Sequence, residues 1–115
     1  MAQLNIKQRQ AGDVTILDLD GEVRIGDSAT ALRSAIREHV STGNTKILLN
    51  LAGVRYIDSS GIGELIANYT TVGRSGGQLK LLSLTDKVQD LLVITKLLTV
   101  FDVYDAESEA LSSFK

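Results

Sequence analysis

Residues 46–69 read KILLNLAGVRYIDSSGIGELIANY, and the succession of patterns in this stretch predicts the fold class. Its first six residues, KILLNL, are almost continuously apolar, which is typical of a central strand covered on both faces. After Asp58 the spacing changes, and Ile62, Leu65 and Ile66 recur as they do on one face of a helix. A buried strand that leads directly into a helix indicates an α/β protein with parallel strands.

The segments before this stretch predict a hairpin and a helix. LNIKQRQ and VTILDLDGEV have strand patterns and are separated by a turn at AGD, so we expect them to pair as an antiparallel edge. In IGDSATALRSAIREHV the apolar residues follow helical spacing, and either Asp27 or Ser28 is expected to cap that helix. We expect the charges of RSAIREH to form a solvated helix face.

The segments after it repeat the alternation. QLKLLSL predicts another buried strand, and SLTD resembles a capping box that opens a third helix, with Asp86 as the acidic member. VFDVY predicts a last strand and AESEALSSF a short final helix. We expect Gly73 to close the helix that begins after Asp58, and the glycines of VGRSGG to form a helix-to-strand turn. The predicted order is β-β-α-β-α-β-α-β-α in one domain spanning residues 1–115, with a mixed, mostly parallel β-sheet.

Composition narrows the classes of function. The chain has 115 residues, a net charge of −2 and no cysteine, so thiol catalysis and disulfides are excluded and nothing indicates direct nucleic-acid binding. The polar start MAQLNIKQRQ lacks the apolar core of a secretory signal, and no apolar run approaches the length of a membrane span. We therefore expect a soluble protein with no membrane insertion.

Enzymatic chemistry finds little support in these residues. The single histidine, His39, falls in the last turn of a predicted helix, where the helix dipole favours a cation, and neither Ser59 nor Ser60 fits a G-x-S-x-G elbow. No calcium loop or Walker phosphate loop is present, so we expect no catalytic residue, metal or cofactor. A small hydrolase or nucleotide-binding enzyme is the alternative from another class.

The segment DSSGIGEL at residues 58–65 has two interpretations. Asp58, Ser59 or Ser60 can cap the following helix by accepting hydrogen bonds from its free N–H groups. Capping needs no glycine, however, whereas Gly61 and Gly63 expose backbone to another molecule. Because a helix N-terminus also tolerates a phosphate, a modified serine or a docking site fits equally well.

YIDSSGIGEL, together with the strand KILLNL before it and GGQLKLLSLTDKVQDLLVITKLLTVFDVY after it, resembles the STAS domain of bacterial anti-sigma factor antagonists. The resemblance extends over nearly the whole chain and implies the STAS fold. It places the family's phosphorylated serine at Ser59, directly after Asp58 and before Ser60, Gly61, Ile62 and Gly63, with isoleucine at position 62 where leucine is commoner. Residues 21–28, GEVRIGDS, align with the family's variable loop beside the phosphosite, so Arg24, Asp27 and Ser28 are expected to influence partner choice.

The resemblance also implies a mechanism and a set of partners. In partner switching, the unphosphorylated antagonist binds an anti-sigma factor that is a serine kinase and so frees a sigma factor. The kinase then phosphorylates the serine, the complex separates, and a PP2C-type phosphatase resets the cycle in the cytoplasm. The kinase supplies ATP, magnesium and the base, which agrees with the missing base in this chain. A STAS subunit of a lipid-transport complex or of a stress-signalling scaffold is the alternative within the family.

Overall fold

The structure is a computed structural model that describes residues 4–114. The strands and helices follow the predicted order: β1 (Leu4–Ala11), β2 (Val14–Val23), α1 (Asp27–Ser41), β3 (Lys46–Ile57), α2 (Ser59–Arg74), β4 (Gln78–Leu82), α3 (Asp86–Ile94), β5 (Val103–Tyr104) and α4 (Glu107–Ser113). The α/β class and the element order predicted from the sequence are confirmed.

The strands form one sheet in the order β1-β2-β3-β4-β5. β1 and β2 pair antiparallel through a tight hairpin in which Gly12 adopts the left-handed φ of 62° that glycine tolerates best. The pairs β2–β3, β3–β4 and β4–β5 are all parallel. The mixed sheet with one antiparallel edge is therefore the sheet expected from a hairpin followed by alternating helices and strands.

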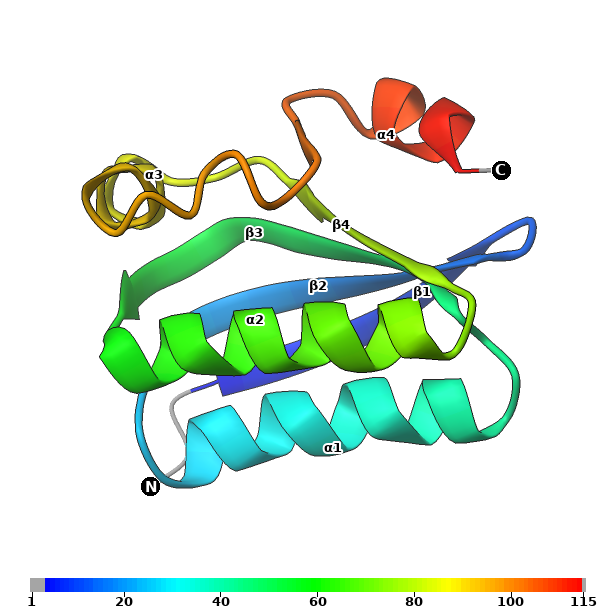
Figure 1. The fold of residues 1–115 in the computed structure, drawn as a ribbon, viewed down its shortest axis with the longest axis horizontal. Helices are drawn as coiled ribbons and strands as arrows, with labels where there is room; N and C mark the ends of the chain where they lie inside the picture. Colours follow the sequence, from blue (N-terminus) through cyan, green and yellow to red (C-terminus); the bar gives the residue numbers. More distant parts are fainter. Residues whose placement is uncertain (1–3, 115) are drawn as a thin grey trace.

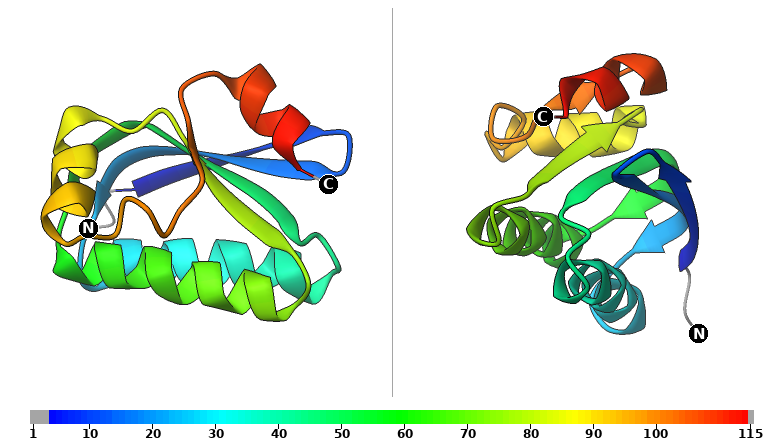
Figure 2. Two further views of the ribbon diagram at one scale, coloured as in Figure 1. Left: turned by 45° about the horizontal axis from the view of Figure 1, so that its top comes forward. Right: turned by 90° about the vertical axis from the view of Figure 1, so that its right-hand side faces the viewer.

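The helices lie on both sides of the sheet. α1 and α2 run side by side below it in Figure 1, whereas α3 and α4 lie above it. The end-on view in Figure 2 (right) shows the same separation. Because α1 follows β2 and α2 follows β3, the loops that lead into these two helices lie next to each other at one end of the sheet (Figure 1).

Alternating side chains of the central strands divide the core into two clusters. Ile47 and Leu49 of β3 belong to the larger cluster, which also contains Leu32 of α1 and Leu65 of α2. Leu48 points the other way, into a smaller cluster with apolar residues of β2, β4 and α4. This is why the run KILLNL is apolar at successive positions rather than at every second one.

Two of the expected helix caps are wrong. Gly26, not Asp27 or Ser28, precedes the first turn of α1, and no side chain caps that helix. The cap of α3 is Thr85, whose Oγ1 accepts the N–H of Val88 at 3.4 Å, so Ser83 does not form a capping box. The Ser28 hydroxyl is instead bonded to the Arg24 backbone, and the Thr85 hydroxyl is held by its donation to the Val54 carbonyl at 3.1 Å.

The C-terminal elements also differ in extent from the prediction. β5 has only two residues, Val103 and Tyr104, because the segment before it curves away after placing Phe101 in the core. α2 continues one residue past Gly73 to Arg74, and the chain reverses at Gly76, where φ is 80°. The glycines of VGRSGG thus form the helix-to-strand turn that the sequence predicts.

Candidate functional site

Asp58 holds together the two loops that meet at the end of the sheet. Its Oδ1 accepts the backbone N–H of Gly61 at 2.8 Å and caps α2, while its Oδ2 accepts the N–H of Ile25 at 3.1 Å. The Asp58 N–H also donates to the carbonyl of Val23 at 3.2 Å. One residue therefore fixes both the start of α2 and the position of the loop between β2 and α1.

The loop between β2 and α1 is fixed from its other side by Ser28. The Ser28 hydroxyl accepts the N–H of Arg24 at 2.8 Å and donates to the Arg24 carbonyl at 3.1 Å. Ser28 itself is 5% exposed. Its hydroxyl therefore shapes the loop from inside and offers no surface to a partner.

Ser59 is the exposed residue at the centre of this region. It occupies the first position of α2, immediately after the Asp58 cap, and Ser60 beside it is partly buried. The side-chain cap of α2 is Asp58, so neither serine is needed for that role. Ser59 is thus accessible from solvent on the first turn of α2.

The two glycines after the serines, Gly61 and Gly63, differ in whether the fold has room for a side chain. A Cβ on Gly61 would lie 2.5 Å from the Val23 carbonyl and 2.6 Å from Cγ1 of Ile57, so the close approach of α2 to the sheet requires glycine there. A Cβ on Gly63 would meet nothing within 4 Å. Gly63 is exposed, so packing does not require glycine at this position. Glycine inside a helix costs about 1 kcal/mol of stability relative to alanine, and nothing in the fold offsets that cost here.

The surroundings of Asp58 keep its carboxylate ionised. Desolvation acts to raise its pKa, but the hydrogen bonds from Gly61, Ile25 and Ser60 and the nearby charge of Arg24 together hold the pKa below its usual value. The site therefore carries a negative charge next to the Ser59 hydroxyl at neutral pH.

Cationic and aromatic side chains border the site. The guanidinium of Arg24 lies 4.4 Å from the centroid of the Tyr56 ring and pairs through Nε with Glu22 at 2.8 Å. Nζ of Lys87, on α3, lies 5.7 Å from the same ring. Tyr56 also lines a hollow of about 250 Å³ with α3 residues that include the exposed Ile94.

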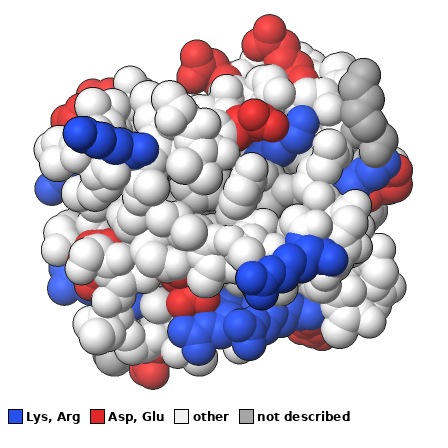
Figure 3. Space-filling model, in the orientation of Figure 1, with Lys and Arg blue, Asp and Glu red and all other residues white. Residues whose placement is uncertain are grey.

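An ion pair between the buried Glu64 and the partly exposed Arg33 joins α2 to α1 one turn beyond the serines. Glu64 is 7% exposed and accepts two hydrogen bonds from Arg33, each of 2.8 Å. Asn68 donates to the Glu64 backbone carbonyl at 2.8 Å. Figure 3 shows Lys and Arg atoms gathered over α1 and α2. The Arg33 side chain is 43% exposed and so remains solvated, but it also has a partner in Glu64 that the sequence does not predict.

The single histidine of the chain lies far from Ser59. His39 lies in the last turn of α1, twelve residues after Asp27 and so about 18 Å along the helix from the end that faces Ser59. Within residues 4–114 no group of three or more metal-binding side chains is present. No helix of the described part is long and apolar enough to cross a membrane.

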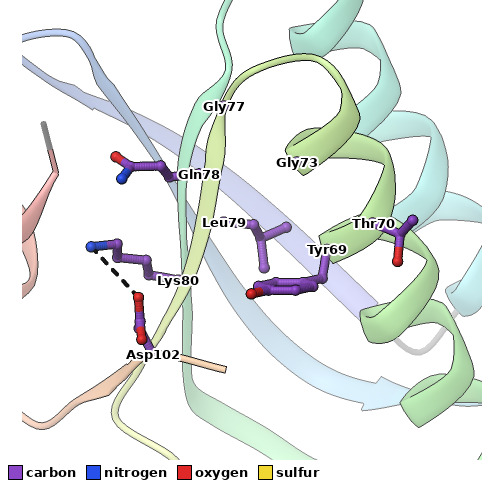
Figure 4. Close-up of a pocket in the computed structure, with 8 residues that line it drawn as sticks. All are labelled: Tyr69, Thr70, Gly73, Gly77, Gln78, Leu79, Lys80 and Asp102. Carbon is purple, nitrogen blue, oxygen red and sulfur yellow. Dashed lines mark ion pairs between the residues drawn. The ribbon is translucent and has the colours of Figure 1, made fainter. Parts of the chain in front are cut away.

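A hollow of about 410 Å³ lies between α2 and β4 (Figure 4). It is lined by Tyr69, Thr70 and Gly73, near the end of α2 opposite Ser59. Nζ of Lys80 donates to the backbone carbonyl and hydroxyl of Ser113 at 3.0 and 2.9 Å, and lies 3.8 Å from Asp102. The Lys80 ammonium group is therefore held by Ser113 and Asp102, and the hollow is separate from the region around Asp58.

Comparison with known proteins identifies the family of this chain. The model of the STAS domain family matches residues 5–110. This chain belongs to the STAS domain family. It is 31% identical over 103 residues to a Thermotoga maritima protein named as a proposed anti-sigma factor antagonist, covering 90% of this chain and 91% of that protein. It is 29% identical to the anti-sigma-B factor antagonist of Bacillus subtilis, covering 92% of this chain and 94% of that one.

A solved structure supports the same relationship. The crystal structure of a Thermotoga maritima protein, likewise described as a proposed anti-sigma factor antagonist, superposes on this STAS domain with a TM-score of 0.88. The two are 29% identical, and the match covers 95% of this chain and 93% of the other. The STAS fold expected from the sequence is thus confirmed.

The structure sorts the residues that the sequence predicts for the site of this STAS domain. Exposed or partly exposed around the start of α2 are Arg24, Asp27, Asp58, Ser59, Ser60 and Gly63. Ser28, Gly61 and Ile62 are buried and support these residues from beneath. Direct contact with a partner therefore stays a prediction for the exposed and partly exposed residues only, and Ser28, Gly61 and Ile62 are no longer expected to touch a partner.

Sequence patterns missed several residues of the same region. Ile25 is 77% exposed and joins the site through its backbone N–H, while Tyr56 and Lys87 approach it from β3 and α3. An apolar residue between Arg24 and Gly26 in a polar loop is a signal for Ile25. Nothing in the local sequence marks Lys87, because its position depends on how α3 packs.

Proposed function

We propose that this STAS domain is an anti-sigma factor antagonist that binds an anti-sigma factor serine kinase when Ser59 is unmodified and is released when Ser59 is phosphorylated. The observation that carries the proposal is the exposed Ser59 hydroxyl on the first turn of α2, beside a cap that is fully provided by Asp58. The names of the family members described above support the role in sigma-factor regulation.

In this proposal the domain presents a substrate and performs no chemistry itself. Both oxygens of Asp58 already accept backbone hydrogen bonds, from Gly61 and from Ile25, which suits this residue to positioning rather than to proton transfer. The kinase therefore supplies the base, the magnesium ion and ATP. A PP2C-type phosphatase then reaches Ser59 from solvent and restores the binding form.

Release follows from the change in charge at the contact. A phosphate on Ser59 adds about −1.5 to −2 charges at pH 7 in a position next to the ionised Asp58. A partner that packs closely against the hydroxyl has to desolvate that charge or move away. An unpaired buried polar group costs about 1–3 kcal/mol, and a charged one costs more, so the complex separates.

The test is capture of the partner with immobilised protein from native cell extract, using the parent and Ser59→Asp as baits, followed by incubation with ATP and magnesium. We expect a serine kinase to be retained by the parent, lost from the variant and released by ATP, and fragment mass spectrometry should place one phosphate on Ser59. Recovery of membrane-transport subunits instead, with no kinase on either bait, would favour the lipid-transport alternative. A phosphate on Ser60 or Thr70 with Ser59 unmodified contradicts the site.

A further inference from the structure

Arg24 lies on the loop between β2 and α1, between the two residues that are hydrogen-bonded to Asp58, the cap of α2. In the parallel pair of β2 and β3, Glu22 is opposite Tyr56 and Val23 is opposite Ile57, so the next residue, Arg24, lies opposite Asp58. The Asp58 N–H donates to the Val23 carbonyl, and its side-chain Oδ2 accepts the N–H of Ile25, so Asp58 is bonded to the residues on both sides of Arg24. Adjacent strands are about 4.8 Å apart, which is less than the length of an arginine side chain.

The backbone of Arg24 is fixed, but its side chain is held only by surface contacts. Its N–H and carbonyl bond the Ser28 hydroxyl, and the carbonyl also accepts the N–H of Ala29 at 3.1 Å. The side chain is 50% exposed and rests on Glu22 and the Tyr56 ring. An exposed ion pair contributes little to stability, so Arg24 can exchange Glu22 for a stronger partner at small cost.

A phosphate on Ser59 is such a partner. It carries about two negative charges and three acceptor oxygens, whereas Glu22 offers one charge. The guanidinium group matches phosphate oxygens with two parallel hydrogen bonds, which a lysine cannot do. Arg24 is the cation whose charge acts on Asp58, the residue directly before Ser59, and its backbone is fixed by Ser28.

We propose that Arg24 binds the phosphate of phosphorylated Ser59 within the same chain, leaving Glu22 and the face of Tyr56 as it does so. This inference rests on the proposed phosphorylation of Ser59 and adds a mechanism to it. Phosphorylation then changes the surface in two ways: it adds a charge at Ser59, and it removes a cation from Tyr56. Both changes affect the surface that the unmodified protein offers to a partner.

The experiment needs no kinase, because phosphoserine can be incorporated at position 59 during translation. The phosphorylated parent is compared with phosphorylated Arg24→Gln by following the ³¹P chemical shift against pH. We expect Arg24→Gln to raise the second pKa of the phosphate, ordinarily about 6, by about 0.5 unit or more, because an adjacent cation favours the dianion. The matched control is Arg55→Gln, which removes an exposed arginine of β3 that pairs with Asp20 at 3.2 Å.

A second measurement follows the ring of Tyr56 by NMR. We expect its resonances to change on phosphorylation in the parent and to remain unchanged in Arg24→Gln, whose ring carries no guanidinium in either state. An equal phosphate pKa in the parent and Arg24→Gln overturns the inference, as does a larger pKa change in Lys87→Gln than in Arg24→Gln. Since no kinase takes part, a failure here is independent of whether partner switching itself is correct.

Discussion

Arg33 of α1 and Glu64 of α2 are joined by two parallel hydrogen bonds of 2.8 Å, and the Glu64 carboxylate is almost completely removed from solvent. The pair lies one turn beyond Ser59 and links the two helices whose N-terminal ends border the site. It therefore contributes both to the stability of the fold and to the relative position of the two loops.

Removal of Arg33 is expected to destabilise the domain. Arg33→Ala leaves the buried Glu64 carboxylate with only the 3.3 Å hydrogen bond from Asn68, and we expect a loss of about 1–3 kcal/mol in the free energy of unfolding. The control is Arg37→Ala, an exposed arginine on the same helix, for which a change within about 0.5 kcal/mol is expected. Urea unfolding of the variants measures both values. If Arg33→Ala and Arg37→Ala lower the free energy of unfolding equally, the Arg33–Glu64 pair contributes no more than the loss of one positive charge from α1.

Asp58 should make stability depend on pH in the acid range. Its pKa in the folded protein is below the usual value, so its ionised form stabilises the fold above the pKa of the unfolded chain, about 3.9, and this contribution disappears as the pH falls through the folded pKa. Asp58→Asn keeps one acceptor oxygen, which can cap α2, but loses the charge and the second acceptor that bonds Ile25. Asp58→Ala loses both acceptors and should cost about 0.5–2 kcal/mol.

The measurement for Asp58 is thermal unfolding of the parent and both variants between pH 2 and pH 7. We expect the parent to lose its advantage over Asp58→Asn below about pH 4, because the group that is ionised in the fold then becomes protonated. A constant difference between the parent and Asp58→Asn across this range would mean that the carboxylate acts only as a hydrogen-bond acceptor.

Gly61 and Gly63 form a matched pair for separating fold from function. We expect Gly61→Ala to destabilise the domain, because its Cβ would overlap the Val23 carbonyl and Ile57. Gly63→Ala has open space around it and should stabilise α2 by up to about 1 kcal/mol. If Gly63 is at the kinase contact, the same stabilised variant should bind the kinase less tightly, which calorimetric titration can measure. Undiminished binding would remove Gly63 from the predicted contact.

Substitution of Ser59 should separate binding from release. Ser59→Ala is expected to fold and to bind the kinase, but ATP should not release it, because it has no hydroxyl to phosphorylate. Ser59→Asp adds a charge beside Asp58 and should bind weakly. Binding is followed by size-exclusion chromatography of the mixture with and without ATP and magnesium. An Asp variant that binds as tightly as the parent would show that charge at this position is not the switch.

Phosphorylation is expected to weaken kinase binding without unfolding the domain. In the free protein the start of α2 stabilises the phosphate by about 0.3–1 kcal/mol, and repulsion from Asp58 is similar in size and screened by salt. In the complex a desolvated charge costs more than about 1.4 kcal/mol, so we expect affinity to fall at least about tenfold with little change in melting temperature. A phosphoprotein that melts many degrees lower would mean that the switch acts by disrupting the fold.

The sequence by itself was sufficient for the order of elements and for the position of Ser59. Apolar runs such as KILLNL and the helical spacing after Asp58 are local patterns, and they identify strands and helices wherever one face of each is buried. The segment DSSGIG is local too, so its place at the start of α2 follows from the same pattern.

Only the tertiary structure decided which polar residue caps α2, which carboxylate is paired, and which arginine lies near the site. Asp58 rather than Ser60 caps α2, because Asp58 also reaches Ile25 of a loop 33 residues away along the chain. The Glu64 carboxylate is paired because Arg33 lies on the neighbouring helix, and Arg24 is near Asp58 because Asp58 bonds both of its neighbours, Val23 and Ile25. These roles depend on contacts between distant segments, and spacing along one segment contains no information about the segment that packs against it.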